Sequence, residues 1–121
     1  MSVPPKILYI DDEHDLLHLA SSFFEEENLP IDTCSNFSEA LEKIRNGAYD
    51  LVISDARMPS GTGKELLSII KSEKLNCGKF ILITGNPDFA DQDDKDNYDM
   101  ILFKPFKFSD LIDRSRSMLK I

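Results

Sequence analysis

The sequence predicts an α/β domain in which helices cover both faces of a parallel β-sheet. Short apolar runs alternate five times with longer segments whose apolar residues recur at helical spacing. Alternation of this kind is typical of parallel sheets, because each helix returns the chain to the edge where the previous strand began. Polar residues suited to metal and phosphate chemistry follow four of the five runs. A ligand site is therefore expected at the carboxyl ends of the strands.

The first part of the chain supplies three predicted strands. They cover residues 6–10, 29–34 and 50–54. Residues 1–5 are expected to precede the fold as an extension, because Pro4-Pro5 cannot lie inside a helix or a central strand. Helices are predicted between the strands, the first opening at Asp12 or Glu13 and the second after the cap-forming segment 35–39.

The second part of the chain continues the alternation. A loop is predicted at 58–63, a helix at 64–74, strands at 79–83 and 100–103, and a last helix capped by Ser109. The segment 86–99 holds six aspartates and little apolar periodicity, so only a short or frayed helix is expected there.

Length, charge and residue composition narrow the class of protein. One domain over residues 1–121 is expected from the length, and the net charge of −8 argues against binding to nucleic acid or to anionic membrane. No apolar stretch approaches the roughly 20 residues that a bilayer span needs, and no signal peptide is evident, so a cytoplasmic protein is expected. Cys34 and Cys77 match no zinc pattern and are predicted to be reduced, buried thiols.

Three carboxylates are expected to meet at the strand ends. Asp11 and Asp12 follow the first predicted strand, and Asp55 follows the third. An Asp-Asp pair alone equally suits a helix N-cap, but a third carboxylate at a neighbouring strand end favours a hard cation, of which Mg²⁺ fits best. His14 and His18 have metal-ligand spacing but no evident third ligand, so a solvated helix face is favoured for them.

Aspartate can also act as a nucleophile toward phosphorus. Such a reaction needs a cation and polar donors around the phosphoryl oxygens. Thr84 and Lys104, each at the end of an apolar run, offer a hydroxyl and an ammonium group. The Lys104-Pro105 bond is a candidate for the cis form, as X-Pro bonds in tight turns are.

Four short motifs carry a family resemblance. They are Ile10-Asp11-Asp12-Glu13, Ser54-Asp55-Ala56-Arg57-Met58-Pro59 with Gly63, Ile83-Thr84-Gly85 and Phe103-Lys104-Pro105-Phe106. Each is weak alone, but their order and spacing are specific. Over essentially its whole length the chain resembles the receiver domain of two-component response regulators, similar to the single-domain chemotaxis type.

The resemblance implies a role for each acidic residue. Asp55 is expected to be the phosphoacceptor. Asp12 and Asp55 are expected to bind Mg²⁺ directly, together with the backbone carbonyl of Arg57. Asp11 is expected to act through water or as a further acidic partner.

The resemblance also implies a fold and partners. The fold is the flavodoxin-like (βα)5 sandwich with strand order 2-1-3-4-5. Thr84 and Lys104 are expected to contact the phosphoryl group. The donor is expected to be a sensor histidine kinase or a histidine phosphotransfer domain, and the response to pass to an unknown output protein through protein contacts, since residues 1–121 leave no room for an output domain.

The sequence departs from the family pattern after Thr84. Many receivers carry an aromatic residue three positions before the lysine, but Ile101 stands there, and Phe103 is expected on the other face of its strand. Gly85 replaces the more usual alanine, and the interval between Thr84 and Lys104 is about two residues short. The sequence therefore does not predict that phosphorylation changes this part of the domain in the way usual for the family.

Other functions stay open at this stage. The same residues could form a receiver within a hybrid kinase or a longer regulator, or a receiver whose partner binding is constitutive. An aspartyl-phosphate phosphatase or phosphotransferase is disfavoured, because such enzymes usually carry an acid two residues after the nucleophile, where Arg57 stands. A flavin-binding module would need a Ser/Thr/Gly-rich phosphate loop after the first strand. The leading prediction is a signalling domain rather than an enzyme.

Overall fold

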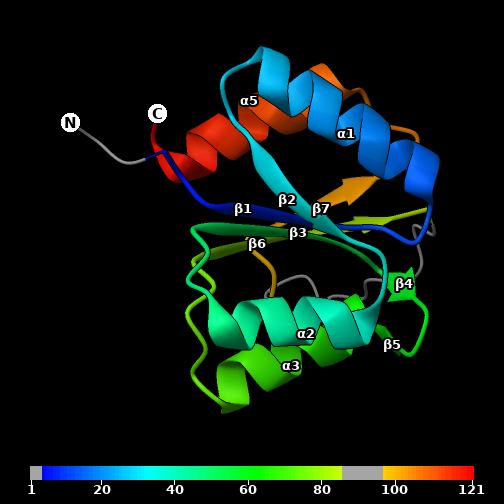
Figure 1. Cartoon of the computed structure of the whole chain (residues 1–121), viewed down its shortest axis with the longest axis vertical. Helices are drawn as coiled ribbons and strands as arrows, with labels where there is room; N and C mark the ends of the chain where they lie inside the picture. The colour runs from blue at the N-terminus through cyan, green and yellow to red at the C-terminus, as the bar shows by residue number, and fades with distance from the viewer. Residues whose placement is uncertain (1–3, 86–96) are drawn as a thin grey trace.

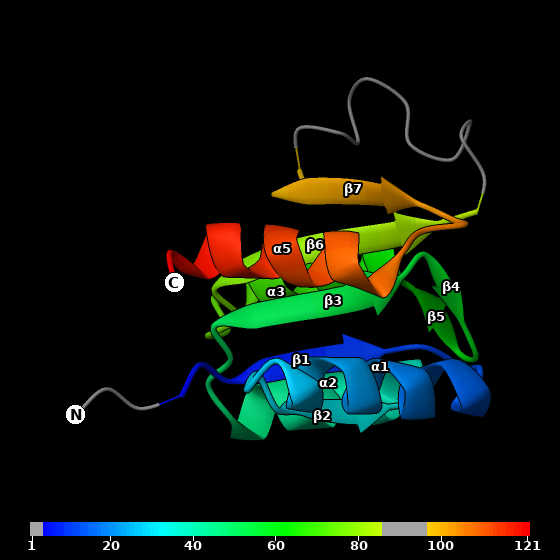
Figure 2. The same cartoon turned by 90° about the horizontal axis from the view of Figure 1, so that it is seen from above.

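A five-stranded parallel sheet forms the centre of the molecule in the computed structural model, which describes residues 4–85 and 97–121. Its strands are β1 (Ile7–Ile10), β2 (Ile31–Cys34), β3 (Leu51–Asp55), β6 (Lys79–Thr84) and β7 (Met100–Phe103). They pair in the order β2-β1-β3-β6-β7, and every pair is parallel. Counted along the chain, this is the predicted order 2-1-3-4-5. Figure 2 shows all five strands ending at the same edge.

Helices cover both faces of the sheet (Figure 1). They are α1 (His14–Glu26), α2 (Phe37–Asn46), α3 (Gly63–Ser72) and α5 (Phe108–Leu119). α1 and α5 cover one face, and α2 and α3 cover the other. The predicted α/β fold is therefore confirmed.

Strand β1 contributes side chains to the hydrophobic cores on both faces of the sheet. Leu8 and Ile10 pack with residues of α2 and α3, whereas Ile7 and Tyr9 pack with residues of α1 and α5. This is the alternation of a strand that is buried on both faces. The continuous apolar run of β1 follows from that double burial.

Cap chemistry decides where the helices begin. The Asn36 side chain accepts a hydrogen bond from the Glu39 N–H at 2.8 Å, as the predicted cap at 35–39 requires. Thr62 does the same for Glu65 at 3.1 Å, so α3 starts slightly before the predicted residue 64. The predicted cap at Ser109 is wrong. Lys107 holds the N-cap position of α5, which places Ser109 inside the first turn.

The predicted loop at 58–63 contains regular structure. Strands β4 (Arg57–Met58) and β5 (Gly61–Thr62) form an antiparallel hairpin beyond the carboxyl edge of the sheet (Figure 2). Ser60 turns the chain with a φ of 73°. A hairpin of two-residue strands gives too short an alternation to be recognised in sequence.

The side chains of strand β7 alternate between the two faces of the sheet. Ile101 packs toward the α2 and α3 side, whereas Met100 and Leu102 pack toward α1 and α5. By the same alternation Phe103 lies on the side of Ile101, so the expectation that it faces the other way was wrong. Its side chain is 41% exposed. Most of the predicted frayed helix at 86–99 lies outside the described residues.

Two further expectations can be compared with the structure. Cys34 and Cys77 are free and buried, as predicted, and burial raises the pKa of both thiols to about 12. Within residues 4–85 and 97–121, none of the helices has the length and hydropathy of a membrane span.

Candidate functional site

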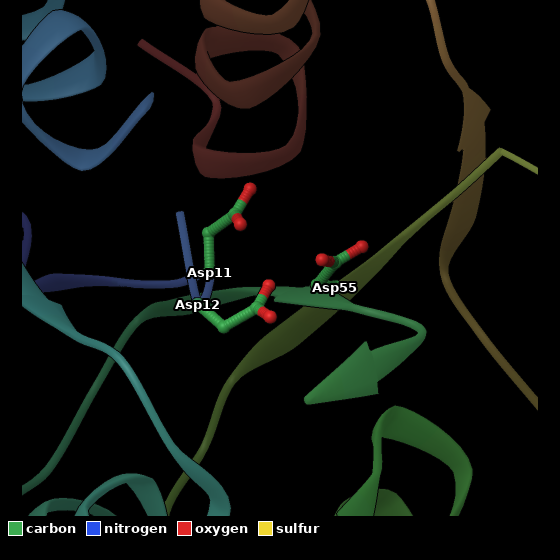
Figure 3. A group of neighbouring side chains, drawn as sticks. All are labelled: Asp11, Asp12 and Asp55. Atoms are coloured by element: carbon green, nitrogen blue, oxygen red, sulfur yellow. The ribbon is translucent and has the colours of Figure 1, made fainter. Parts of the chain in front are cut away.

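Three carboxylates meet at the carboxyl edge of the sheet, as the strand ends predicted. The register pairs Ile10 with Ser54, so the residues that follow, Asp11 and Asp55, lie side by side at the ends of β1 and β3. Carboxylate oxygens of Asp11, Asp12 and Asp55 lie within 4.8 Å of one another. Figure 3 shows the three side chains gathered at this edge.

Asp11 is the most deeply placed of the three. Only 2% of it is exposed. Its N–H donates to the Cys34 carbonyl of the neighbouring strand at 3.1 Å, and its Oδ1 accepts the Glu13 N–H at 3.0 Å. These bonds fix the turn from β1 into α1, and Oδ2 lies 3.8 Å from the Lys104 ammonium.

Asp55 is held by its neighbours in the chain. Its Oδ1 accepts the Ala56 N–H at 3.1 Å, and its main-chain carbonyl accepts the Ser54 hydroxyl at 2.9 Å. Gly63 approaches this carbonyl so closely that an added Cβ would lie 2.9 Å from it. The start of α3 therefore packs directly on the backbone of Asp55.

Lys104 brings a positive charge to the cluster. Its Nζ lies 3.4 Å from Asp55 Oδ1 and 3.8 Å from Asp11 Oδ2. The Lys104 N–H donates to the Thr84 carbonyl at 2.8 Å, which fixes the end of β7 against β6. The Lys104-Pro105 bond is cis.

Thr84 is near Asp55 through the sheet, and Arg57 is near it along the chain. Thr84 is the buried last residue of β6, and its strand neighbour Ile83 is paired with Asp55. Arg57 is the exposed first residue of β4, two positions after Asp55. Within the described residues, His14 and His18 do not join the carboxylate group, in line with the solvated helix face expected for them.

Burial and mutual repulsion disturb the ionisation of the carboxyl groups. Burial, with the charge of Asp11 next, raises the pKa of Asp55 from 3.8 to about 6, although Lys104 opposes the shift. Burial also raises the pKa of Asp11. Burial alone lowers the pKa of Lys104, but the charges of Asp55 and Asp11 outweigh it and raise that pKa. One ammonium group therefore balances the three carboxylates only in part.

The donor set fits a hard divalent cation. Carboxylate oxygens are the ligands that Mg²⁺ prefers, and a cation would relieve the repulsion that raises the pKa of Asp55. Exposed Asp12 leaves the cluster open to solvent on one side, which suits an ion that keeps several waters.

Comparison with known proteins identifies the family. The model of the response regulator receiver domain matches residues 7–116. The chain belongs to the response regulator receiver family. Proteins of this family act in two-component signalling, as the motifs predicted.

Relatives of this receiver domain are longer than the chain. It is 31% identical over 117 residues to the response regulator ArlR of Staphylococcus saprophyticus, covering 95% of this chain and 52% of that protein. It is also 31% identical to the transcriptional regulatory protein ResD of Bacillus subtilis, covering 95% and 48%. The receiver domain thus spans about half the length of these relatives.

Solved receiver structures share the fold. The Francisella response regulator 1452 receiver domain has a TM-score of 0.87 and 28% identity, with 96% of this chain and 97% of that chain covered. TrrA of Thermotoga maritima, solved in complex with Mg²⁺ and BeF, has a TM-score of 0.83 and 33% identity, with 94% and 98% covered.

The sequence did not point to Tyr9. It lies in the middle of β1, where an apolar run is expected, and its ring is buried as that pattern predicts. It precedes Asp11 by two residues, and its hydroxyl is a buried polar atom. The one available signal was a tyrosine within an otherwise aliphatic buried strand.

Proposed function

We propose that this receiver domain accepts a phosphoryl group on Asp55, with Mg²⁺ bound beside it. One observation carries the proposal: the oxygens of three carboxylates lie within 4.8 Å of one another, with the Lys104 ammonium 3.4 Å from Asp55. The relative TrrA, solved with Mg²⁺ and BeF, supports the same chemistry. Asp55 is the only one of the three carboxylates that is half-buried and next to the ammonium group, as a positioned nucleophile requires.

The transfer is a displacement at phosphorus. A carboxylate oxygen of Asp55 forms a bond to phosphorus while the phosphorus–nitrogen bond of a phosphohistidine breaks, and the imidazole keeps the electron pair. The Lys104 ammonium lies close enough to Asp55 to stabilise first the charge of its carboxylate and then the charge of the phosphoryl oxygens. Thr84, at the end of β6, is proposed to contact the same oxygens through its hydroxyl.

Asp11, Asp12, Asp55 and the carbonyl of Arg57 are the proposed holders of the cation. When bound, Mg²⁺ supplies positive charge that offsets the carboxylates and the incoming phosphoryl group. Asp12 and Asp55 are proposed as direct ligands, and Asp11, which is nearly buried, as a partner acting through water.

The proposed donor is a sensor histidine kinase or a histidine phosphotransfer domain in the cytoplasm. The response is proposed to pass to an output protein by protein contacts. Because the matched relatives are about twice as long, the domain is equally compatible with a place inside a longer regulator. Arg57 occupies the position where aspartyl-phosphate phosphatases carry an acid, which favours signalling over turnover of small substrates.

The decisive experiment is phosphorylation by a small phosphodonor in the presence of Mg²⁺, followed by intact-mass measurement. The parent protein is expected to gain one phosphoryl group, and Asp55→Asn to gain none. Asp113→Asn is the matched control, because Asp113 is an exposed aspartate of α5. Labelling that survives Asp55→Asn at the level of the parent and the control would refute Asp55 as the acceptor.

A further inference from the structure

Tyr9 carries a polar atom into an apolar layer. The residue is 1% exposed, and its ring meets that of Phe24 edge-on with the ring centres 6.5 Å apart. Within residues 4–85 and 97–121, the Tyr9 hydroxyl has no hydrogen-bond partner. Buried hydroxyl groups in proteins nearly always have one, supplied by protein or by an ordered water. This hydroxyl therefore needs a hydrogen-bond partner, which its apolar neighbours cannot provide.

The backbone places Tyr9 just below the acidic cluster, on one face of the sheet. Asp11 directly follows β1 and lies two residues after Tyr9, so the alternation of the strand puts both residues on the same side of the sheet. The register pairs Tyr9 with Ile53, which places both one layer beneath Asp11 and Asp55.

Asp11 has acceptor capacity to spare. Its Oδ1 accepts one N–H, from Glu13, and its Oδ2 lies 3.8 Å from Lys104 Nζ, which is longer than a hydrogen bond. An ionised carboxylate offers about four acceptor positions. A phenol is protonated at neutral pH and can donate. The donor that lacks a partner and the acceptor with free positions thus lie in adjacent layers.

We propose that Tyr9 is a positioning residue of the acidic site, whose hydroxyl donates a hydrogen bond to Asp11 through one bound water. A water is proposed as the link because the described residues provide no direct hydrogen bond to this hydroxyl, and a bridging water can replace a direct bond at little cost. The link holds the Asp11 carboxylate from below, as partners behind metal-binding carboxylates commonly do. Its effect on Mg²⁺ rests on the proposed function.

A crystal structure of the metal-free protein, at a resolution that shows ordered water, tests the contact. One water is expected within hydrogen-bond distance of both the Tyr9 hydroxyl and the Asp11 carboxylate. A hydroxyl that bonds to any other group, or that has no partner, would overturn the proposal.

The Mg²⁺ dissociation constant, measured by calorimetry, tests the role. Tyr9→Phe removes one oxygen atom and keeps the packing, and it is expected to weaken Mg²⁺ binding about tenfold. Tyr49→Phe is the matched control. The Tyr49 hydroxyl donates to Asp32 at 2.9 Å, and Tyr49 lies before β3, at the opposite end of that strand from Asp55. This control is expected to lower stability while leaving Mg²⁺ affinity unchanged.

The outcomes separate the two proposals. If the parent binds Mg²⁺ and Tyr9→Phe binds it equally well, with both proteins folded by urea titration, Tyr9 only fills space and the inference fails while the proposed function stands. If the parent binds no Mg²⁺, the proposed metal site fails, and the positioning role fails with it.

Discussion

The Lys104 ammonium lies 3.4 Å from a carboxylate oxygen of Asp55, although 49 residues separate the two in the chain. The same ammonium lies 3.8 Å from Asp11. One cation is thus shared between two carboxylates, and Asp12 adds a third negative charge. The site therefore keeps an unbalanced negative charge, and this governs both its stability and its ligand preference.

The first prediction concerns pH. The pKa of Asp55 is about 6 in the folded protein and 3.8 without the fold, so the folded state holds a proton that the unfolded state has already lost between these values. Stability of the metal-free protein should therefore fall as pH rises from about 4 to about 6, by about 2 kcal/mol from this residue. Urea unfolding across this pH range measures it, and saturating Mg²⁺ should flatten the fall.

Asp55→Asn is the control for that measurement. Without the Asp55 carboxyl, the decline should be clearly smaller, although Asp11, whose pKa is also raised, keeps part of it. An equal decline in the variant and the parent would show that Asp55 is not the source.

The second prediction concerns the shared cation. Lys104→Met keeps most of the side-chain volume but leaves the carboxylates without their ammonium group, so the metal-free protein should lose about 1–2 kcal/mol at neutral pH. Thermal or urea unfolding measures the loss. Lys107→Met, at an exposed lysine, should change stability by less than about 0.5 kcal/mol. Similar effects of the two substitutions would contradict the role given to Lys104.

The third prediction concerns two glycines. An added Cβ at Gly63 would lie 2.6 Å from Leu82 Cδ1 and 2.9 Å from the Asp55 carbonyl, so Gly63→Ala should cost about 1–3 kcal/mol and slow phosphorylation by shifting the Asp55 backbone. At Gly85 the nearest atom would be Lys104 Cβ at 4.0 Å. Gly85→Ala should therefore be neutral within about 0.5 kcal/mol. The prediction fails if Gly63→Ala is as stable and as readily phosphorylated as Gly85→Ala.

The fourth prediction separates side-chain from backbone ligands. Asp12→Ala removes a proposed direct ligand and should weaken Mg²⁺ binding at least about tenfold. Arg57→Ala keeps the proposed carbonyl ligand and should change the Mg²⁺ dissociation constant by less than about threefold, because exposed charges contribute little. Arg57→Ala should instead alter the lifetime of the phosphorylated state. Equal decay rates for parent and variant would contradict that expectation.

Much of the fold could be predicted because its signals are local. Apolar runs separated by helical periodicity predicted a parallel sheet, and the cap-forming segment 35–39 predicted the start of α2, whose cap is Asn36. Where the signal was short or ambiguous, prediction failed. Ser109 is a good capping residue by type, yet Lys107 holds the cap position of α5, and the β4–β5 hairpin has strands too short for any periodicity.

The sequence by itself determined which groups reach the site, because strand ends of a parallel sheet share one edge. Asp55 ends a strand of that sheet, and Asp11, Asp12 and Lys104 follow strands. Only the tertiary structure decided how these groups affect one another. It placed one ammonium between two carboxylates, raised the pKa of Asp55, and, among the described residues, left the buried Tyr9 hydroxyl without a hydrogen-bond partner. The reason is physical: electrostatic and hydrogen-bond energies depend on distance through space and on burial, and neither is encoded in the spacing of residues along the chain.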